Sequence, residues 1–254
     1  MSRNTQIGFF QSILNAQTSF NPIDLNPEFY WSAESGVFVD NAETTIPTDG
    51  QNIAVIRDAN HIFNQTTGGS PTWHQNEVNG HPAVQFDGSN DFLENSTLAT
   101  GIPLPDTPST VIFVMKPNVV LNAGSPWVFT DAASSRPYYR NFRGMSTGDY
   151  QFYERDLSGT DKQIFWGTVT ADWQYLTMLE SGTLGNFYKN GTQIVFNADT
   201  DVGANSFSRM WLGKGFSGGQ YFDGYIASIF IKWAEVTPTE LTQLHNFFSS
   251  KYGI

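Results

Sequence analysis

Short hydrophobic stretches separated by polar turns run through the whole chain, and this pattern predicts an all-β protein. Residues 110–116 (TVIFVMK) form a nearly continuous apolar, β-branched run, which is typical of a central strand covered on both faces. Turn residues separate the runs about every 8–12 residues, a spacing that favours a sandwich of two antiparallel sheets. The runs expected to form strands are 25–31, 36–39, 53–58, 83–86, 92–93, 110–116, 127–130, 163–170, 173–180, 184–189, 192–196, 210–212 and 221–233.

Glycine positions predict where this sheet protein turns. Asn190-Gly191 lies between two of the expected strands, and it predicts a two-residue β-hairpin because both residues tolerate a positive φ angle. Asn79-Gly80 gives the same signal further upstream. Inside the last run, Gly224 allows a sharp bend or a close approach of another backbone.

One short helix is expected, close to the C-terminus. Thr237 and Pro238 give a helix-start signal, a hydroxyl residue as N-cap followed by proline at the first helical position, and Glu240 places an acid in the first turn. Apolar residues then recur at helical spacing, so one face of the helix should dock on a sheet. They are Leu241, Leu244, Phe247 and Phe248.

Residues 25–254 are expected to form one domain. Residues 1–24 precede it and have a different, amphipathic pattern of apolar positions. The apolar positions of this N-terminal segment suit one helix or an extended arm. The segment could pack on the surface of its own domain, or it could be an assembly arm that docks on a partner or on a symmetry mate. Its apolar residues are Ile7, Phe9, Phe10, Ile13 and Leu14.

Composition narrows the function classes. The 254 residues carry 24 acidic and 13 basic side chains, a formal net charge of −11 with no basic stripe, so no nucleic-acid binding is expected. The absence of cysteine excludes disulfides, thiolate metal sites and a cysteine nucleophile. No run reaches the ~20 apolar residues of a membrane span, and the first residues lack the apolar core of a signal peptide. We therefore expect no membrane insertion and synthesis in a cytoplasm.

Residues 131–161 are polar, aromatic and irregular, and they hold the candidate binding residues. Sugars stack their C–H faces on aromatic rings, while arginine, asparagine and aspartate side chains hydrogen-bond to the hydroxyl groups. A glycan or protein contact is one interpretation of this mixture, and packing of the rings in the core and its rim is the other. The candidates are Tyr138, Tyr139, Arg140, Arg143, Tyr150 and Tyr153.

Three segments and the chain end together resemble a known superfamily. The segments read NGHPAVQFDGSNDFL (79–93), WQYLTMLE followed by GNFYKNGTQI (173–194) and YFDGYIASIFI (221–231), and the chain ends LTQLHNFFSSKYGI. Their order and spacing resemble the laminin-G-like branch of the concanavalin A-like lectin/glucanase superfamily, over residues 25–254. The resemblance implies a two-sheet antiparallel jelly-roll sandwich.

The resemblance also implies a role. Free-standing laminin-G-like chains with a short N-terminal arm, no signal peptide and no cysteine are similar to particle proteins of tailed bacteriophages. A non-enzymatic, virion-associated structural protein is therefore expected, as capsid decoration, head fibre or tail component. Residues 1–24 would contact other virion proteins or symmetry mates in a homo-oligomer, and the sandwich could contact host glycans. The alternatives are a glycoside hydrolase or lyase of the same fold and a simple lectin module.

Catalytic residues are not expected. Glucanases of this superfamily carry E-x-D-x-x-E on one strand, which supplies the paired carboxylates of the retaining mechanism. Glu154 and Asp156 match the first half of that motif, but Gly159 stands at its third acidic position. Residues 215–219 satisfy G-x-S-x-G around Ser217, yet a nucleophile elbow leads into a helix and a strand is expected here.

No cofactor is expected, with calcium as the alternative. Asp87, Asp91 and Asp223 sit in turns of the kind that hold calcium in some laminin-G-like domains, and hard oxygen ligands suit Ca²⁺. The D-x-D-x-D-G pattern is missing, so turn capping is the simpler interpretation. The histidines lack the spacing of metal ligands, and each is expected to be structural. They are His61, His74, His81 and His245.

Overall fold

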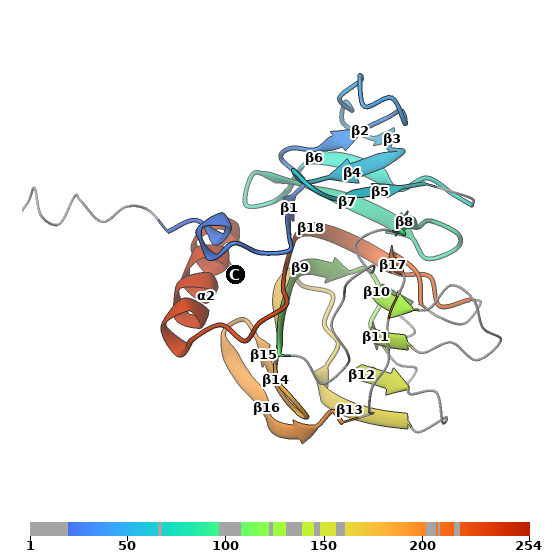
Figure 1. The fold of residues 1–254 in the computed structure, drawn as a ribbon. Coiled ribbons are helices and arrows are strands. Elements are labelled where there is room, and N and C mark those ends of the chain that lie inside the picture. Colours follow the sequence, from blue (N-terminus) through green and yellow to red (C-terminus); the bar gives the residue numbers. More distant parts are fainter. Residues whose placement is uncertain are drawn as a thin grey trace, which may run out of the picture.

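The described residues form two antiparallel sheets of nine strands each, which confirms the predicted two-sheet sandwich but with more strands than expected. In Figure 1 they form two layers, and helix α2 (Pro238–Tyr252) lies outside one of them. The computed structural model describes residues 20–65, 68–96, 108–121, 124–130, 139–144, 148–155, 161–201, 207, 209–215 and 219–254, with the backbone alone at 139–144.

Sheet A is built around strand β9 (Ser109–Pro117), which is buried from Ser109 to Met115 as its apolar sequence predicted. β14 pairs with one edge of β9, and β18 pairs with the other. β7 and β1 share the far edge of β18. The order is β16 (Thr192–Asp199), β15 (Leu184–Lys189), β14 (Gln174–Ser181), β9, β18 (Asp223–Lys232), β7 (His81–Asp87), β6 (Thr72–Val78) and β3 (Gln51–Asn52), with β1 (Phe29–Ser32) beside β18.

Sheet B contains most of the shorter strands. Its order is β13 (Asp161–Thr168), β12 (Asp149–Arg155), β11 (Tyr139–Gly144), β10 (Gly124–Thr130), β17 (Arg209–Leu212), β8 (Leu93–Asn95), β5 (Ile62–Asn64), β4 (Val55–Arg57) and β2 (Val37–Phe38). β17, which comes late in the chain, therefore lies between β10 and β8. This crossing places residues from three distant parts of the sequence side by side.

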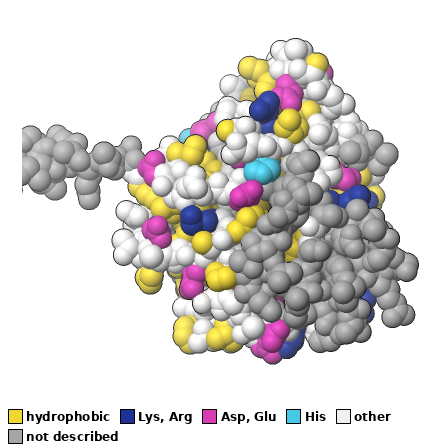
Figure 2. All heavy atoms as spheres, in the orientation of Figure 1, with side chains coloured by type: hydrophobic (Ala, Val, Ile, Leu, Met, Phe, Trp, Pro, Cys, Tyr) yellow, Lys and Arg dark blue, Asp and Glu magenta, His cyan; other side chains and the backbone are white. Residues whose placement is uncertain are grey.

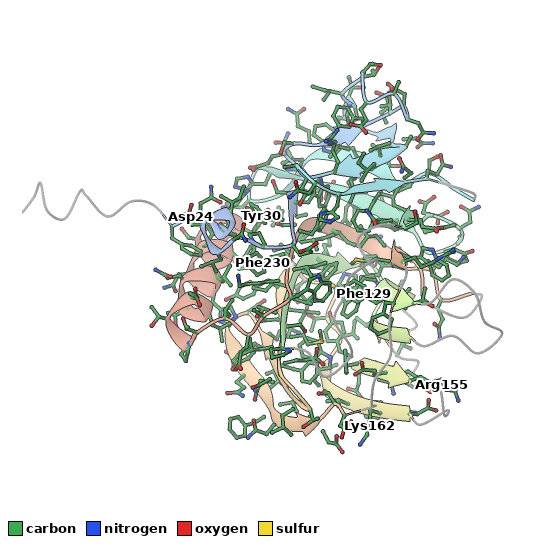
Figure 3. All side chains as sticks on the ribbon, viewed as in Figure 1. Asp24, Tyr30, Phe129, Arg155, Lys162 and Phe230 are labelled. Atoms are coloured by element: carbon green, nitrogen blue, oxygen red, sulfur yellow. The ribbon has the colours of Figure 1, made fainter. Side chains whose placement is uncertain are left out.

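Large apolar side chains fill the space between the sheets. Phe113 of β9 stacks on Trp127 of β10 with ring centroids 5.7 Å apart, and Phe129 lies 5.3 Å from Trp127. Figure 3 labels Phe129 in this layer. Because successive strand residues point to opposite faces, every second residue of β10 and β17 contributes to the other face of sheet B instead.

Helix α2 covers the outer face of sheet A. It begins with the predicted capping box, in which Glu240 N–H donates to Thr237 Oγ1 (3.3 Å) and Thr237 N–H donates to Glu240 Oε2 (2.7 Å). Phe230 of β18 belongs to the apolar cluster beneath the helix (Figure 3). The helix residues buried there are Leu241, Leu244, Phe248 and Tyr252.

Residues 20–25 pack on the domain next to this helix. The Phe20 ring lies edge-on to the ring of Phe247, with centroids 6.3 Å apart, and the one-turn helix η1 (Pro22–Leu25) follows. Phe247 was predicted to face the sheet. It is instead only partly buried, and Phe20 of the N-terminal segment packs against its ring. Residues 1–19 lie outside the described residues, so an assembly role for them stays a prediction.

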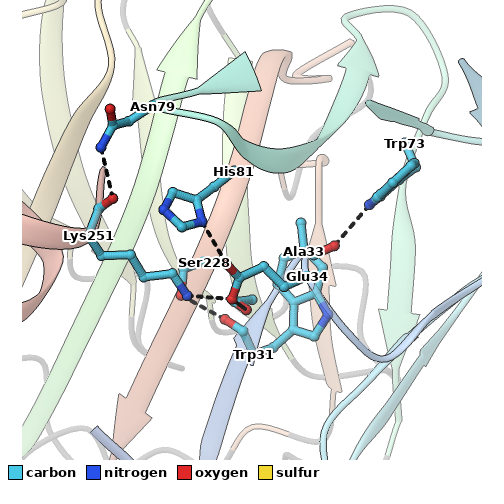
Figure 4. Close-up of polar contacts among 9 residues, drawn as sticks. Trp31, Ala33, Glu34, Trp73, Asn79, His81, Ser228 and Lys251 are labelled. Carbon is cyan, nitrogen blue, oxygen red and sulfur yellow. Dashed lines mark hydrogen bonds and ion pairs between the residues drawn. The ribbon is translucent and has the colours of Figure 1, made fainter. Parts of the chain in front are cut away.

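Polar contacts fasten the end of α2 to the turn after β1 (Figure 4). Glu34 accepts a hydrogen bond from Lys251 Nζ at 2.6 Å and lies 2.6 Å from His81 Nδ1. Partial burial raises the pKa of Glu34, but the hydrogen bonds and charges of Lys251 and His81 outweigh burial and hold it below its ordinary value. Beside them, Ser228 Oγ donates to Trp31 O at 2.7 Å.

The predicted turns have the expected backbone. Asn190 and Gly191 have φ angles of 49° and 75°, as a tight hairpin between β15 and β16 requires. A Cβ on Gly224 would lie 2.4 Å from Lys116 O, so the predicted close approach of another backbone is confirmed.

Several strands were missed by the sequence prediction or given wrong boundaries. Residues 131–161, expected to be irregular, contain β11 and β12. β12 is buried on both faces, so its residues do not alternate between apolar and polar, the pattern by which a half-buried strand is recognised in a sequence. Strand β6 was not expected at all, because its sequence TWHQNEV is largely polar. The last long strand covers residues 223–232 instead of 221–233.

Candidate functional site

The outer face of sheet B carries no helix in the described part of the chain. Strand β17 shows which side chains reach this face. Met210 and Leu212 are buried in the core between the sheets, so alternation places Arg209 and Trp211 on the opposite side. Trp211 is partly exposed there and packs beside Val128 of β10.

Three aromatic rings and two cations gather on this face and form what we name the aromatic–cation cluster. The Phe92 ring lies 6.4 Å from the Trp211 ring and 6.5 Å from the Tyr221 ring. The Lys214 ammonium lies 4.4, 4.6 and 5.8 Å from the centroids of these three rings, respectively. The Arg209 guanidinium lies 5.8 Å from the Trp211 ring. All four distances fall within the range of cation–π attraction.

The glycine-rich bend after β17 positions Lys214. Gly213 has a φ angle of 81°, and a Cβ on it would lie 2.2 Å from the Phe86 ring, so the chain turns here only with glycine. Lys214 then forms an isolated backbone bridge with Tyr221 across the bend. The bend itself, at residues 216–218, lies outside the described residues.

One carboxylate faces the two cations. Arg209 Nη1 pairs with Glu94 Oε1 at 3.2 Å. Burial lowers the pKa of Lys214; the charge of Glu94 opposes this effect and the charge of Arg209 adds to it. The cluster therefore combines two partly exposed rings, Trp211 and Tyr221, and the buried ring of Phe92 with hydrogen-bond donors and one acceptor, while Val128 and Tyr153 on the same sheet face are buried.

Two of the predicted binding residues lie near this face, but inside the protein. Tyr153 is 7% exposed and packs against Val128 and Trp211, so it supports the cluster from below. Tyr150 is fully buried in the core, where its ring lies 6.0 Å from Trp166. Neither ring has an open surface on which a sugar could stack in this structure.

The other predicted binding residues lie on or before β11. Tyr138 lies outside the described residues. Tyr139, Arg140 and Arg143 occupy β11, whose backbone register places Arg140 opposite Glu154. A binding role for these residues stays a prediction. Sequence reasoning missed Trp211 and Lys214, although the alternation in RMWL could have indicated that Trp211 faces away from the core.

A cleft with a volume of about 770 Å³ lies where η1 and β1 meet the turn from β2 to β4, and we name it the N-terminal cleft. Its charges are already matched within the chain. Arg57 forms an ion pair with Glu43. Asp58 Oδ1 accepts hydrogen bonds from the N–H groups of Asn60 (2.8 Å) and His61 (2.7 Å).

The candidate catalytic motifs gain no support. Glu154 is fully buried in β12, while Asp156 and Ser217 lie outside the described residues. The expectation that the protein is not an enzyme stays a prediction.

The carboxylate oxygens of two candidate calcium ligands already accept hydrogen bonds from within the chain. Asp87 Oδ1 accepts hydrogen bonds from the N–H groups of Ser89 (2.8 Å), Asn90 (3.0 Å) and Asp91 (3.2 Å). Asp223 Oδ1 accepts one from the side-chain amide of Asn118 at 2.8 Å, so its lone pairs are partly used as well. Among the residues with described side chains, no three His, Asp or Glu form a group that could hold a metal ion.

Charged side chains are scattered over the visible surface. In Figure 2, the described Lys and Arg side chains occur singly between Asp and Glu side chains, and no basic stripe crosses this face. None of the helices described combines the length and hydropathy that a bilayer span requires.

No protein-family model matches the sequence, and no curated protein matches it. Solved structures are similar in fold. Domain 4 of AbnA, a GH43 extracellular arabinanase from Geobacillus stearothermophilus in complex with arabinotriose, is 17% identical with a TM-score of 0.57. The alignment covers 86% of this chain and 98% of that domain.

Two larger proteins contain a similar unit. A Trypanosoma rangeli sialidase in complex with 2,3-difluoro-KDN is 10% identical with a TM-score of 0.57, and the alignment covers 81% of this chain and 32% of the sialidase. The botulinum neurotoxin serotype G binding domain is 11% identical with a TM-score of 0.56, covering 89% of this chain and 52% of that one. This chain thus spans a third of the sialidase and half of the neurotoxin domain. At these identities, what is shared is the β-sandwich fold.

Proposed function

We propose that this protein binds a glycan on the outer face of sheet B, through the aromatic–cation cluster and without transforming it. The observation that carries the proposal is the pair of partly exposed rings, Trp211 and Tyr221, beside charged side chains on a sheet face that no described helix covers. The outer face of sheet A differs, since α2 occupies it.

The chemistry of the cluster suits a sugar. The flat faces of aromatic rings pack against sugar C–H groups, and this contact removes apolar surface of both partners from water. Lys214 and Arg209 supply N–H donors and Glu94 supplies acceptor oxygens, so hydroxyl groups at the edge of a stacked sugar would find both kinds of partner.

The structural neighbours support the proposal at the level of the fold. The arabinanase domain, which this chain matches along nearly its whole length, was solved with arabinotriose. A sandwich of this size and topology is therefore able to bind an oligosaccharide. The neurotoxin neighbour is itself named a binding domain.

A place in a bacteriophage particle, with residues 1–24 as the attachment segment, stays a prediction from the resemblance. Glycan binding is compatible with that role, because a virion protein that contacts host glycans needs such a surface. It is equally compatible with the lectin alternative, and it needs no catalytic residue.

The direct test is glycan binding by variants of the cluster. Trp211→Ala removes the central ring, and it should weaken binding to the best ligand of a glycan array at least about tenfold, or about 1.4 kcal/mol. Isothermal titration calorimetry measures the affinity. The control is Phe196→Ala, which removes a ring that is 72% exposed on β16 in the other sheet and should leave the affinity unchanged.

Two outcomes would contradict the proposal. A folded protein that binds no saccharide on the array would remove the function altogether. Loss of binding in Phe38→Ala, with Trp211→Ala unchanged, would move the glycan site to the N-terminal cleft, which Phe38 lines.

A further inference from the structure

Lys214 differs from most other described lysines in what its ammonium group contacts. Lys162 pairs with Asp199 and Lys251 with Glu34. The ammonium groups of Lys189 and Lys232 donate to backbone carbonyl oxygens. The Lys214 ammonium has three aromatic rings around it instead, and no carboxylate lies within 4.0 Å of it among the described residues.

This arrangement leaves a cation without a counter-ion. Glu94 is the acidic residue that acts on Lys214, but its carboxylate already pairs with Arg209. Among the described side chains of the cluster, two cations and one carboxylate leave an excess of positive charge, in a chain whose formal net charge is −11. Removing an ammonium from water costs free energy that rings compensate only in part.

An anion supplied by the ligand would complete this site. The ammonium lies over these rings, so a negatively charged substituent of a sugar that packs on their remaining exposed surface, beside Lys214, would reach it. An ion pair in such a partly dehydrated position is stronger than one in bulk water.

We infer that the glycan carries an anionic group, a carboxylate or a sulfate, that pairs with Lys214 while its sugar ring stacks on Trp211 or Tyr221. The inference rests on the proposed function and narrows it to acidic glycans. Arg209, held by Glu94, remains beside Trp211 as a second positive charge and would favour the same ligands.

Matched pairs of saccharides that differ only in charge provide the test. Oligogalacturonate and its methyl ester, and sialyllactose and its methyl ester, test a carboxylate; keratan sulfate oligosaccharides and their desulfated forms, whose backbone is neutral, test a sulfate. The acidic member of at least one pair should bind the wild-type protein about tenfold more tightly than its neutral partner, a preference of about 1.4 kcal/mol. High salt should reduce this preference, because screening weakens the ion pair and leaves stacking intact.

The variant Lys214→Met keeps an unbranched side chain over the rings and removes the charge. Both members should bind this variant more weakly than they bind the wild type, because Lys214 also donates to hydroxyl groups, but the preference for the acidic member should disappear. Lys116→Met is the matched control, because its ammonium also lies over a ring, Tyr225 at 5.4 Å, but on sheet A. This control should keep the preference, and thermal unfolding checks that both variants fold.

The outcomes separate this inference from the proposed function. If the neutral members bind as tightly as the acidic ones, or if Lys214→Met keeps the preference, the acidic-glycan inference is overturned and glycan binding stands. If no saccharide of either kind binds the folded wild-type protein, both are overturned.

Discussion

A buried histidine makes the stability of this protein sensitive to acid. His245 projects from α2 towards sheet A, with its Nε2 atom 3.1 Å from Thr177 Oγ1 and its ring centroid 5.4 Å from those of Tyr175 and Tyr188. Burial among these groups lowers the pKa of His245 to about 4. No described carboxylate faces the ring to offset this burial, so the neutral imidazole is the form that fits the fold.

The sign of the pH dependence follows from this shift. An unfolded histidine has a pKa of about 6.5, so the unfolded chain takes up the proton first. The contribution of His245 to stability should be complete above about pH 6.5 and be lost as the pH falls towards 4. The full shift corresponds to at most about 3 kcal/mol, which partial solvent access reduces.

His245→Gln should remove this dependence, as urea unfolding measured across that pH range would show. The comparison must be made with the wild type at each pH. Burial and the charge of Asp87 raise the pKa of Asp91 to about 6, which gives a slope of the opposite sign in the same window. An equal loss of stability on acidification in both proteins would contradict the role of His245.

At the scale of elements, the capping box of α2 decides where the helix begins. Thr237→Ala removes the hydroxyl that accepts from Glu240 N–H, and it should lower the free energy of unfolding by about 1 kcal/mol. Thr239→Ala makes the same chemical change at an exposed position of the first turn, and it should change stability by less than about 0.5 kcal/mol. Chemical denaturation of the two variants compares them directly. Equal losses would show that the cap contributes nothing.

At the scale of the whole molecule, residues on both sides of the predicted domain boundary contact the domain. Phe20 and Leu25 pack on the apolar cluster under α2, although the sequence predicted that the domain begins at residue 25. A chain starting at residue 26 should therefore be less stable than one starting at residue 20, by roughly 2–3 kcal/mol for the apolar area that loses its cover. Thermal unfolding of the two truncated chains tests this difference. Equal melting temperatures would support the predicted boundary instead.

Local signals determined much of the fold. The run at 110–116 predicted a buried strand, and β9 lies at the centre of sheet A. Asn190-Gly191 predicted a hairpin, and the Thr237 to Glu240 pattern predicted a capped helix start. Each of these features depends on residues within a few positions of one another, so backbone preference and periodicity are sufficient to reveal them.

Candidate binding residues were harder to predict, because a sequence does not show which aromatic side chains are buried and which are exposed. Tyr150 and Tyr153 stood in an aromatic, polar segment that suited either a binding surface or packing in the core, and β12, which is covered on both sides, buries them. Trp211 was not predicted as a binding residue because it lies in a short apolar strand. The alternation of side chains along β17 nevertheless points it away from the core.

The sequence by itself determined that the chain is an all-β sandwich closed by a capped C-terminal helix, because most of its strands, its tight turns and its helix cap are encoded locally. Only the tertiary structure decided that Phe92, Lys214 and Tyr221 meet around Trp211. Their meeting requires β17 to insert between β10 and β8, which pairs it with residues between 79 and 119 positions earlier in the chain. Nothing in the local sequence specifies that neighbour, because strand order is set by how two whole sheets bury their apolar faces.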